Sequence, residues 1–334
     1  MQLTNEQLRA LANAEQIYAE WLSVLAALSN LPGGMYWRVI RSREYLYEYA
    51  PGQARQRTKS LGPKNPESEA VYEEFQDKKQ DLANRKTGIE NRLKELAPVW
   101  RALNLPAIDE TAGKILRAFD QDGYLGRNVL LIGTYALKVY EVNASFTFLA
   151  EFDSTDDIDF TLITAAVDAD PDLPRRLLLT LKSADSSFIV STSSSKTAVN
   201  DRAYRVDLLL SHAAAAGMTS ARPWKPKALD GQEWLLLGVP VRAVLIDYQG
   251  RPVAATSPDP RYFALHKLWL SKQKSRTPGK AMKDRYQGQA LLSAVQSHMP
   301  HYPMDQAFLG ALPRELRTQM PEASDRKPAA ARRI

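Results

Sequence analysis

The stretch 154–163, Ser-Thr-Asp-Asp-Ile-Asp-Phe-Thr-Leu-Ile, decides the fold. Ile158 and Phe160 alternate with Asp157 and Asp159, and this period of two is typical of a β-strand with one buried face. The two carboxylates therefore project from the same face of the predicted strand. They repel each other unless a cation lies between them, and such hard oxygen ligands suit Mg²⁺ (or Mn²⁺) that bridges to substrate phosphates.

A glycine turn precedes this strand. Residues 128–134, Asn-Val-Leu-Leu-Ile-Gly-Thr, form a short apolar strand, and the apolar positions that follow recur with helical spacing. Gly133 lets a ligand approach the backbone, and we expect Thr134 to cap a helix whose free N–H groups face an anion such as a triphosphate. The alternative for a lone Gly-Thr pair is a plain turn.

A third carboxylate follows in residues 204–210, Tyr-Arg-Val-Asp-Leu-Leu-Leu. The alternation again predicts a strand, which we expect to lie beside the strand of Asp157 and Asp159. Asp207 is then the natural third metal ligand, with a role as general base or as a metal-held activator of an acceptor hydroxyl. The alternative for the strand of Asp157 and Asp159 is a solvated edge strand.

The order of these motifs resembles the polymerase-β-type nucleotidyltransferase superfamily, whose pattern is Gly-Ser or Gly-Thr, then Asp-x-Asp, then a third Asp. The long gap between Gly133 and Asp157 is closer to the AbiEii-like branch of toxin nucleotidyltransferases. The resemblance covers about residues 110 to 300. It implies magnesium-dependent transfer of a nucleoside monophosphate from an NTP, such as ATP, to an RNA, protein or small-molecule acceptor, with release of pyrophosphate.

Two downstream segments, residues 265–268 and 283–286, resemble the third and fourth motifs of that branch. The chain departs from the branch at His266, where the branch has Glu, and at Gln287, where the branch has Asp. 

By analogy, Lys267 contacts the nucleotide phosphates, and Asp284 orients the nucleotide or acts as a base. Lys283, beside Asp284, is also expected to bind the nucleotide. A surface ion pair on a helix is the competing interpretation of Lys267 and Asp284.

The predicted fold is α/β (α+β), with a nucleotidyltransferase-type mixed sheet and flanking helices. Four regions are expected: an N-terminal module of a helix, a basic β-hairpin and a long helix (1–105), a catalytic domain (106–255), a helical C-terminal lobe (256–318) and a disordered tail (319–334). Within the catalytic domain, the segments that begin at Trp234 and Val241 are expected to extend the sheet as a hairpin.

The N-terminal module has its own local motifs. Thr4-x-x-Gln7 matches a capping box before a helix that should end near Ser29, and Asn65-Pro66 should begin a helix that reaches about residue 100. Between the two helices, aromatic, aliphatic and basic residues alternate around a predicted hairpin turn at Pro51-Gly52.

Basic residues cluster in two places, and the chain has a net charge of +6. The hairpin brings arginines near tyrosine and tryptophan, a combination that suits contact with a nucleic acid; the alternative is a packed hairpin with solvated arginines. Its basic residues are Arg38, Arg55, Arg57 and Lys59. The second cluster, between residues 272 and 285, is predicted to close on triphosphate or acceptor, or else to be a solvated helical face.

The amino-acid composition excludes several kinds of site and favours an enzyme of the cytoplasm. The 334 residues contain no cysteine, which excludes disulfides and cysteine-ligated metal sites. Neither a signal peptide nor a transmembrane segment is evident, so a cytoplasmic enzyme is expected. Two other functions stay open: an inactive nucleotidyltransferase-fold protein that binds nucleotide or nucleic acid without turnover, and a toxin that modifies tRNA or protein.

Overall fold

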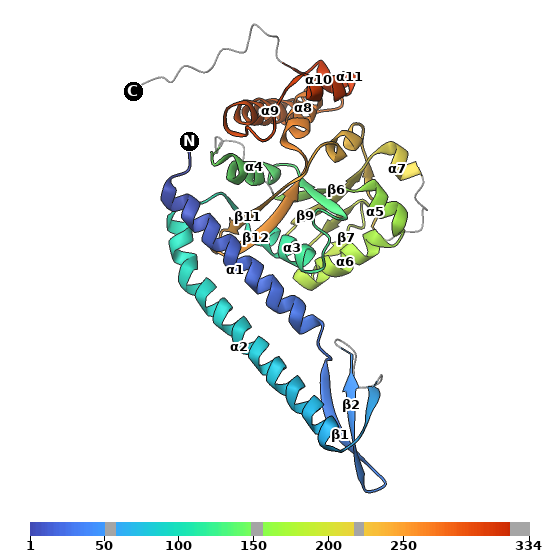
Figure 1. Cartoon of the computed structure of the whole chain (residues 1–334). Helices are drawn as coiled ribbons and strands as arrows, with labels where there is room; N and C mark the ends of the chain where they lie inside the picture. The colour runs from blue at the N-terminus through green and yellow to red at the C-terminus, as the bar shows by residue number, and fades with distance from the viewer. Residues whose placement is uncertain (51–57, 148–155, 217–223, 321–334) are drawn as a thin grey trace. The chain divides into compact units, whose positions relative to one another are not determined.

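The computed structural model describes residues 1–50, 58–147, 156–216 and 224–320. Two compact units make up the chain: Met1–Leu11 with Leu103–Ile334, and Ala12–Ala102. Figure 1 labels the helices and most of the strands. Most of the predicted tail, and Arg55, Arg57 and the predicted turn at Pro51-Gly52, lie outside the described residues.

Helix α1 (Asn5–Ser29) begins at the predicted capping box and ends at the predicted residue. The backbone N–H of Thr4 donates to Oε1 of Gln7 at 2.8 Å, and the N–H of Gln7 donates to Oγ1 of Thr4 at 3.2 Å. The two reciprocal bonds satisfy donors that the first turn of a helix leaves without partners.

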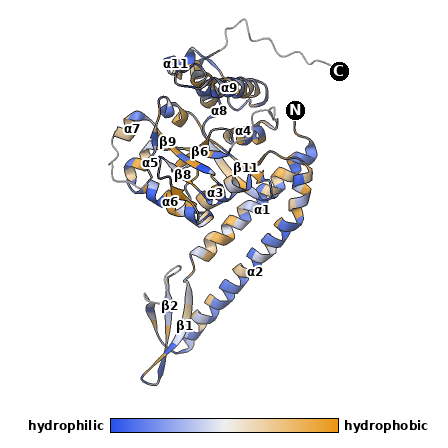
Figure 2. Cartoon of the chain, turned by 180° about the vertical axis from the view of Figure 1, so that it is seen from behind, coloured by the Kyte–Doolittle hydropathy of each residue, from blue (hydrophilic) through white to orange (hydrophobic). Residues whose placement is uncertain are grey.

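Helix α2 (Pro66–Ala102) confirms the predicted long helix. Asn65 and Ser68 cap its start, since each side chain accepts a hydrogen bond from the backbone N–H of the other, at 2.8 and 3.0 Å. The helix is hydrophilic along most of its length (Figure 2), and Phe75 and Leu82 are buried on one side of it.

The sheet between these helices contains the predicted antiparallel hairpin, as β2 and β3, and one further strand that was not predicted. Strands β1 (Gly34–Ile40), β2 (Arg43–Tyr49) and β3 (Thr58–Pro63) form one antiparallel sheet in the order β1-β2-β3. The first turn lies at Arg41 and Ser42, whose φ angles of 48° and 64° are left-handed. The sequence did not reveal this turn because two-residue hairpin turns usually contain Asn or Gly at such angles.

The larger unit contains a six-stranded mixed sheet in the order β5-β6-β9-β8-β7, with β10 paired to β9. Strand β5 (Val129–Ile132) runs antiparallel to β6 (Asp157–Leu162), and β6 runs parallel to β9 (Arg205–Leu210). The predicted proximity of the two acidic strands is therefore confirmed. The remaining strands are β7 (Ile189–Val190), β8 (Thr197–Val199) and β10 (Lys227–Ala228).

A second sheet has the order β12-β11-β4, formed by β12 (Pro252–Ser257), β11 (Val241–Asp247) and β4 (Ala107–Ile108). The predicted hairpin of the Trp234 and Val241 segments is wrong. Gln232–Leu236 is a short 3₁₀ helix, and β11 pairs with β12 instead. An apolar run of this length fits either a buried strand or a buried helical turn, so the sequence pattern does not distinguish them.

Helices cover these sheets and form the C-terminal part of the unit. The prediction that the chain becomes helical from Pro260 onward is confirmed. The helices are α3 (Glu110–Gln121), α4 (Ala136–Ala144), α5 (Thr164–Ala169), α6 (Leu173–Ala184), α7 (His212–Ala216), α8 (Pro260–Leu270), α9 (Pro278–His298), α10 (Gln306–Ala311) and α11 (Arg314–Arg317). Within the described residues, none of the helices is both long and apolar enough to cross a bilayer.

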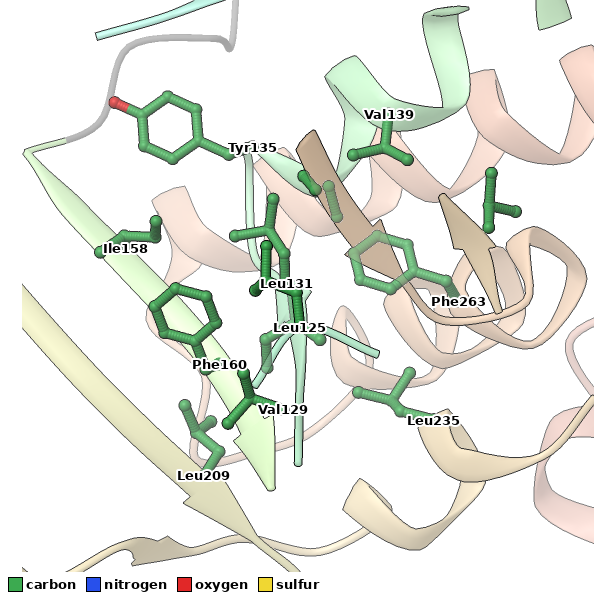
Figure 3. Packing of buried hydrophobic residues seen from close by; sticks show 14 of the residues in the cluster. Leu125, Val129, Leu131, Tyr135, Val139, Ile158, Phe160, Leu209, Leu235 and Phe263 are labelled. Carbon is green, nitrogen blue, oxygen red and sulfur yellow. The ribbon is translucent and has the colours of Figure 1, made fainter. Parts of the chain in front are cut away.

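The apolar face of the central strands forms the core. Ile158 and Phe160 are at most 1% exposed and point toward the side chains of β5 (Figure 3). The rings of Phe160 and Phe119 lie 5.0 Å apart, which ties β6 to helix α3. This packing fixes β6 with its acidic face on the opposite side.

Candidate active site

The three predicted carboxylates lie on adjacent parallel strands. Asp159 of β6 is the register partner of Asp207 of β9, and Asp157 is the register partner of Arg205. Neighbouring strands lie about 4.8 Å apart, so that these positions are close in space. The fold therefore brings together residues that are about fifty positions apart in the sequence.

The carboxyl group of Asp159 is destabilised in its ionised form by this arrangement. Burial raises its pKa to about 7, and the nearby Asp157 and Asp207 add to the effect, while Lys267 and Lys227 oppose it. Asp159 as a whole is half-buried, and its carboxyl group is the buried part of the residue. Like charges this close favour either a proton or a cation between them.

Gly133 lies against the same carboxyl group. Its φ is +74°, and a Cβ atom at this position would lie only 2.9 Å from Oδ2 of Asp159. The predicted glycine turn and the acidic strand thus meet, and only glycine fits both the backbone angle and the space. The expected cap is wrong: Tyr135 occupies the N-cap position of α4, and no side-chain cap bond forms there.

We expect Gly133→Ala to abolish the activity of this site and to destabilise the protein by about 1–3 kcal/mol, because it adds a clash with Asp159 to left-handed strain. Gly123→Ala is the matched control: its φ is +73°, but a Cβ there would have no neighbour within 4 Å. Chemical unfolding should show that the left-handed backbone destabilises both variants. Activity assays should show that only Gly133→Ala loses activity. Equal activity of the two variants would contradict the close approach.

Lys227 is a residue of the site that the sequence did not reveal. Its ammonium group forms an ion pair with Oδ2 of Asp207, and it reaches this position because β10 pairs in parallel with the end of β9. The other oxygen, Oδ1 of Asp207, is buried without a hydrogen-bond partner among the described residues. A buried acceptor of this kind is costly unless a ligand completes it.

The donor set fits a hard divalent cation. Within the part of the chain that the structure describes, no three His, Cys, Asp or Glu side chains are already arranged around a common ion position, and Asp207 instead contacts Lys227. The mutual effect of the carboxylates on Asp159 and the unpartnered Oδ1 of Asp207 are nevertheless what an oxygen-liganded cation would relieve.

Lys267 and Asp284 form a direct ion pair on helices α8 and α9. Nζ of Lys267 donates to Oδ1 of Asp284 at 2.8 Å, and Nε of Arg276 donates to Oδ2 at 2.6 Å. The side chain of Asp284 is 3% exposed and that of Lys267 is 9% exposed, so this is a buried ion pair and not a surface pair. Burial alone would raise the pKa of Asp284, but the two cations outweigh it and lower that pKa.

Lys267 links this ion pair electrostatically to the carboxylates, because its positive charge opposes the rise in the pKa of Asp159. Lys283, another residue predicted to bind the nucleotide, is half-buried on α9, next to Asp284 in sequence. Arg276 is the member of the second basic cluster that pairs with Asp284. The nucleotide-binding roles of Gly133, Thr134, Lys267, Lys283 and Asp284 remain predictions.

Asp109 joins the turn to the third acidic strand. Its Oδ1 caps α3 by accepting from the N–H of Ala112 at 2.9 Å, while Oδ2 accepts from the hydroxyl groups of Tyr135 and Tyr204. Tyr135 begins α4 after the glycine turn, and Tyr204 lies three residues before Asp207. Burial and the carboxylate raise the pKa of Tyr135 above its ordinary value, so that the phenol stays a donor.

Comparison with known proteins gives one match. A family model described as "Nucleotidyltransferase" matches residues 110–313, a range that contains every residue of the site described above except Asp109. No curated protein and no solved structure matches the chain significantly.

Proposed function

The chain belongs to the nucleotidyltransferase family, whose model covers residues 110–313, and from this premise we propose that it transfers a nucleoside monophosphate from an NTP to an acceptor hydroxyl. The observation that carries the proposal is the set of carboxylates around Asp159, pressed against the positive-φ turn at Gly133. Such a pairing suits a triphosphate held next to an acidic centre.

In the proposed reaction, an acceptor oxygen forms a bond to the α-phosphorus, and the bond from that phosphorus to the bridging oxygen breaks. Pyrophosphate leaves with the electron pair of the broken bond. The acceptor proton passes to a carboxylate, and Asp207 is our candidate, since its Oδ1 is a buried acceptor without a partner in the described residues. Positioning and charge neutralisation supply most of the rate enhancement in this class of reaction.

Asp157, Asp159 and Asp207 are the residues that would hold Mg²⁺. When bound, the cation would neutralise charge that develops on the transferred phosphoryl group. Lys267 supports this function by a different route: Asp284 holds its ammonium group at 2.8 Å, so that the charge is fixed instead of free to rotate. Gly133 leaves room for the phosphates to approach the backbone.

The proposal is tested by incubating the protein with each α-³²P-labelled NTP, Mg²⁺ and total cellular RNA and protein, followed by gel separation. Label should appear on an acceptor with the wild-type protein and not with the Asp157→Ala/Asp159→Ala variant. Asp168→Ala is the matched control, because this carboxylate is exposed and lies in α5, the helix that follows β6 in the chain. Equal labelling by wild type and the double variant would refute the proposal, and nucleotide binding without transfer would favour a binding protein.

A further inference from the structure

One face of the β1-β2-β3 sheet carries tyrosines and arginines and no acidic residue. The strand registers place these side chains on the same face, because residues two apart share a face and Tyr36 pairs with Tyr47, Arg38 with Tyr45, and Ile40 with Arg43. We call it the tyrosine face, formed on β1 and β2 by Tyr36, Arg38, Arg43, Tyr45, Tyr47 and Tyr49. The four tyrosines are half-buried and the two arginines are exposed.

The opposite face packs inside the unit. On this face, the ring centroid of Trp37 lies 5.8 Å from that of Tyr72 of α2, and Leu46 is fully buried. The acidic residues of the two strands, Glu44 and Glu48, also belong to this opposite face. Both are paired, Glu44 with Lys64 at 2.8 Å and Glu48 with Lys59 at 3.4 Å. The charges of the opposite face therefore balance one another, and the net positive charge of β1 and β2 lies on the tyrosine face, which is directed away from α2.

Three of the four rings of the tyrosine face contact one another, and one of the pairs is stacked. The centroids of Tyr36 and Tyr47 lie 5.9 Å apart with 24° between the ring planes, and those of Tyr36 and Tyr49 lie 6.4 Å apart. The guanidinium carbon of Arg38 lies 5.9 Å from the centroid of Tyr47. Cross-strand stacking holds the rings as a row, and a row of rings presents π-surface at little further cost in entropy.

We infer that the tyrosine face binds single-stranded nucleic acid. Unpaired bases stack on aromatic rings, and arginines beside the rings neutralise the phosphates between the bases. A duplex has its bases stacked internally and offers mainly its phosphates, so it would use the arginines but not the row of tyrosines. That this nucleic acid is the acceptor of the transfer rests on the proposed function; that it binds does not.

The test is fluorescence anisotropy with a labelled single-stranded RNA of about 16 nucleotides, with single-stranded DNA and duplex RNA of the same sequence as further probes. Two variants remove the two parts of the surface, Tyr36→Leu/Tyr47→Leu and Arg38→Gln/Arg43→Gln. Each should weaken binding of single strands at least about tenfold. The tyrosine variant loses base stacking, which contributes about 1–3 kcal/mol per base, and the arginine variant loses contacts that neutralise phosphates. Comparison of the affinities for single-stranded RNA and single-stranded DNA then shows whether the protein discriminates ribose from deoxyribose.

Lys78→Gln/Lys94→Gln is the matched control, since both lysines are exposed on α2 of the same unit and the variant removes the same charge. Binding by the control should change less than about threefold if the arginines act through their position and not through net charge alone. The arginine variant also serves if the tyrosine variant fails to fold, which circular dichroism would show. Undetectable binding of any single strand, or equal losses in the arginine variant and the control, would overturn the inference.

Failure of the inference and failure of the proposed function are separable. If the Asp157→Ala/Asp159→Ala variant binds RNA like wild type but neither labels it, the tyrosine face stands and the proposed function falls. If wild type labels RNA, and the tyrosine and arginine variants bind RNA as tightly as wild type and label it at the same rate and with the same KM, the proposed function stands and the inference falls.

Discussion

Asp159→Asn should abolish nucleotidyl transfer, by about a thousandfold or more, and at the same time make the protein more stable near pH 8. The loss follows because an amide cannot replace a carboxylate as a ligand for a hard cation. The gain follows because Asn resembles the protonated acid, and burial together with Asp157 and Asp207 raises the pKa of Asp159 to about 7. A single substitution thus moves activity and stability in opposite directions.

The sign and size of the stability change follow from proton linkage. Between about pH 4 and pH 7 the folded state binds a proton at Asp159 that the unfolded chain has lost, so the free energy of unfolding of wild type falls as the pH rises through this window. Relief of this cost should stabilise Asp159→Asn by about 2–4 kcal/mol near pH 8, and by less than half of that near pH 5. Urea unfolding at the two pH values measures the difference.

Asp168→Asn provides the matched control for this experiment, because it removes an exposed carboxylate and should change neither activity nor the pH dependence of stability. Added Mg²⁺ should raise the melting temperature of wild type near pH 8 and should do so much less for Asp159→Asn. If Asp159→Asn were less stable than wild type near pH 8, the surroundings would stabilise the ionised carboxylate. The interpretation of the three carboxylates as a site whose repulsion a cation relieves would then fail.

Asp284→Ala should destabilise the protein by about 3–5 kcal/mol near neutral pH. The substitution leaves the ammonium group of Lys267 buried without the carboxylate that it contacts directly, whereas Arg276 is about one-third exposed and can turn to water. Asp170→Ala is the matched control, since it breaks an ion pair with the exposed Arg176 and should cost less than about 1 kcal/mol. Urea unfolding of the two variants measures the contrast.

The pH dependence of this effect has the opposite sign to that of Asp159. Lys267 and Arg276 lower the pKa of Asp284 against the effect of burial. The stability that the ionised carboxylate contributes is therefore present above the unfolded pKa, near 4, and is lost as the pH falls through the lower folded pKa. The gap between wild type and Asp284→Ala should narrow in acid; a constant gap would mean that packing, and not charge, causes the loss.

A double variant separates the structural role of this pair from its role in activity. Lys267→Met/Asp284→Leu replaces both partners with apolar groups of similar size, and such replacements of buried ion pairs are often neutral or stabilising. Its stability should therefore exceed that of Asp284→Ala. If Lys267 contacts phosphate as proposed, KM for NTP should still rise by about tenfold or more. Recovery of both stability and KM would limit the pair to a structural role.

Local patterns in the sequence predicted the elements that carry the site. The alternation around Asp157 and Asp207 predicted β6 and β9, and the residues before Gly133 predicted β5. The capping box at Thr4 and the Asn65-Pro66 pair predicted where α1 and α2 begin. These predictions succeeded because hydrogen bonds within a few residues and the period of burial are both written in neighbouring positions.

Errors occurred where a segment has two conformations of similar local free energy. Arg41 and Ser42 form a tight turn without the Asn or Gly that normally marks one, and the strand pairing of β1 with β2 stabilises the left-handed angles. Similarly, the Trp234 segment is a 3₁₀ helix because the next strand, β11, pairs with β12. Tertiary contacts outweighed local preference in both places.

The sequence by itself determined the acidic strands, the glycine turn and their order, because alternation and turn chemistry depend on residues that are neighbours in the chain. Only the tertiary structure decided which charges meet. The partnership of Lys227 with Asp207, the burial of Lys267 with Asp284 and the junction of Tyr135 and Tyr204 at Asp109 join residues that are 17 to 95 positions apart. Such contacts depend on how β-strands pair and helices pack, and on the low-dielectric interior that makes each buried charge require a partner.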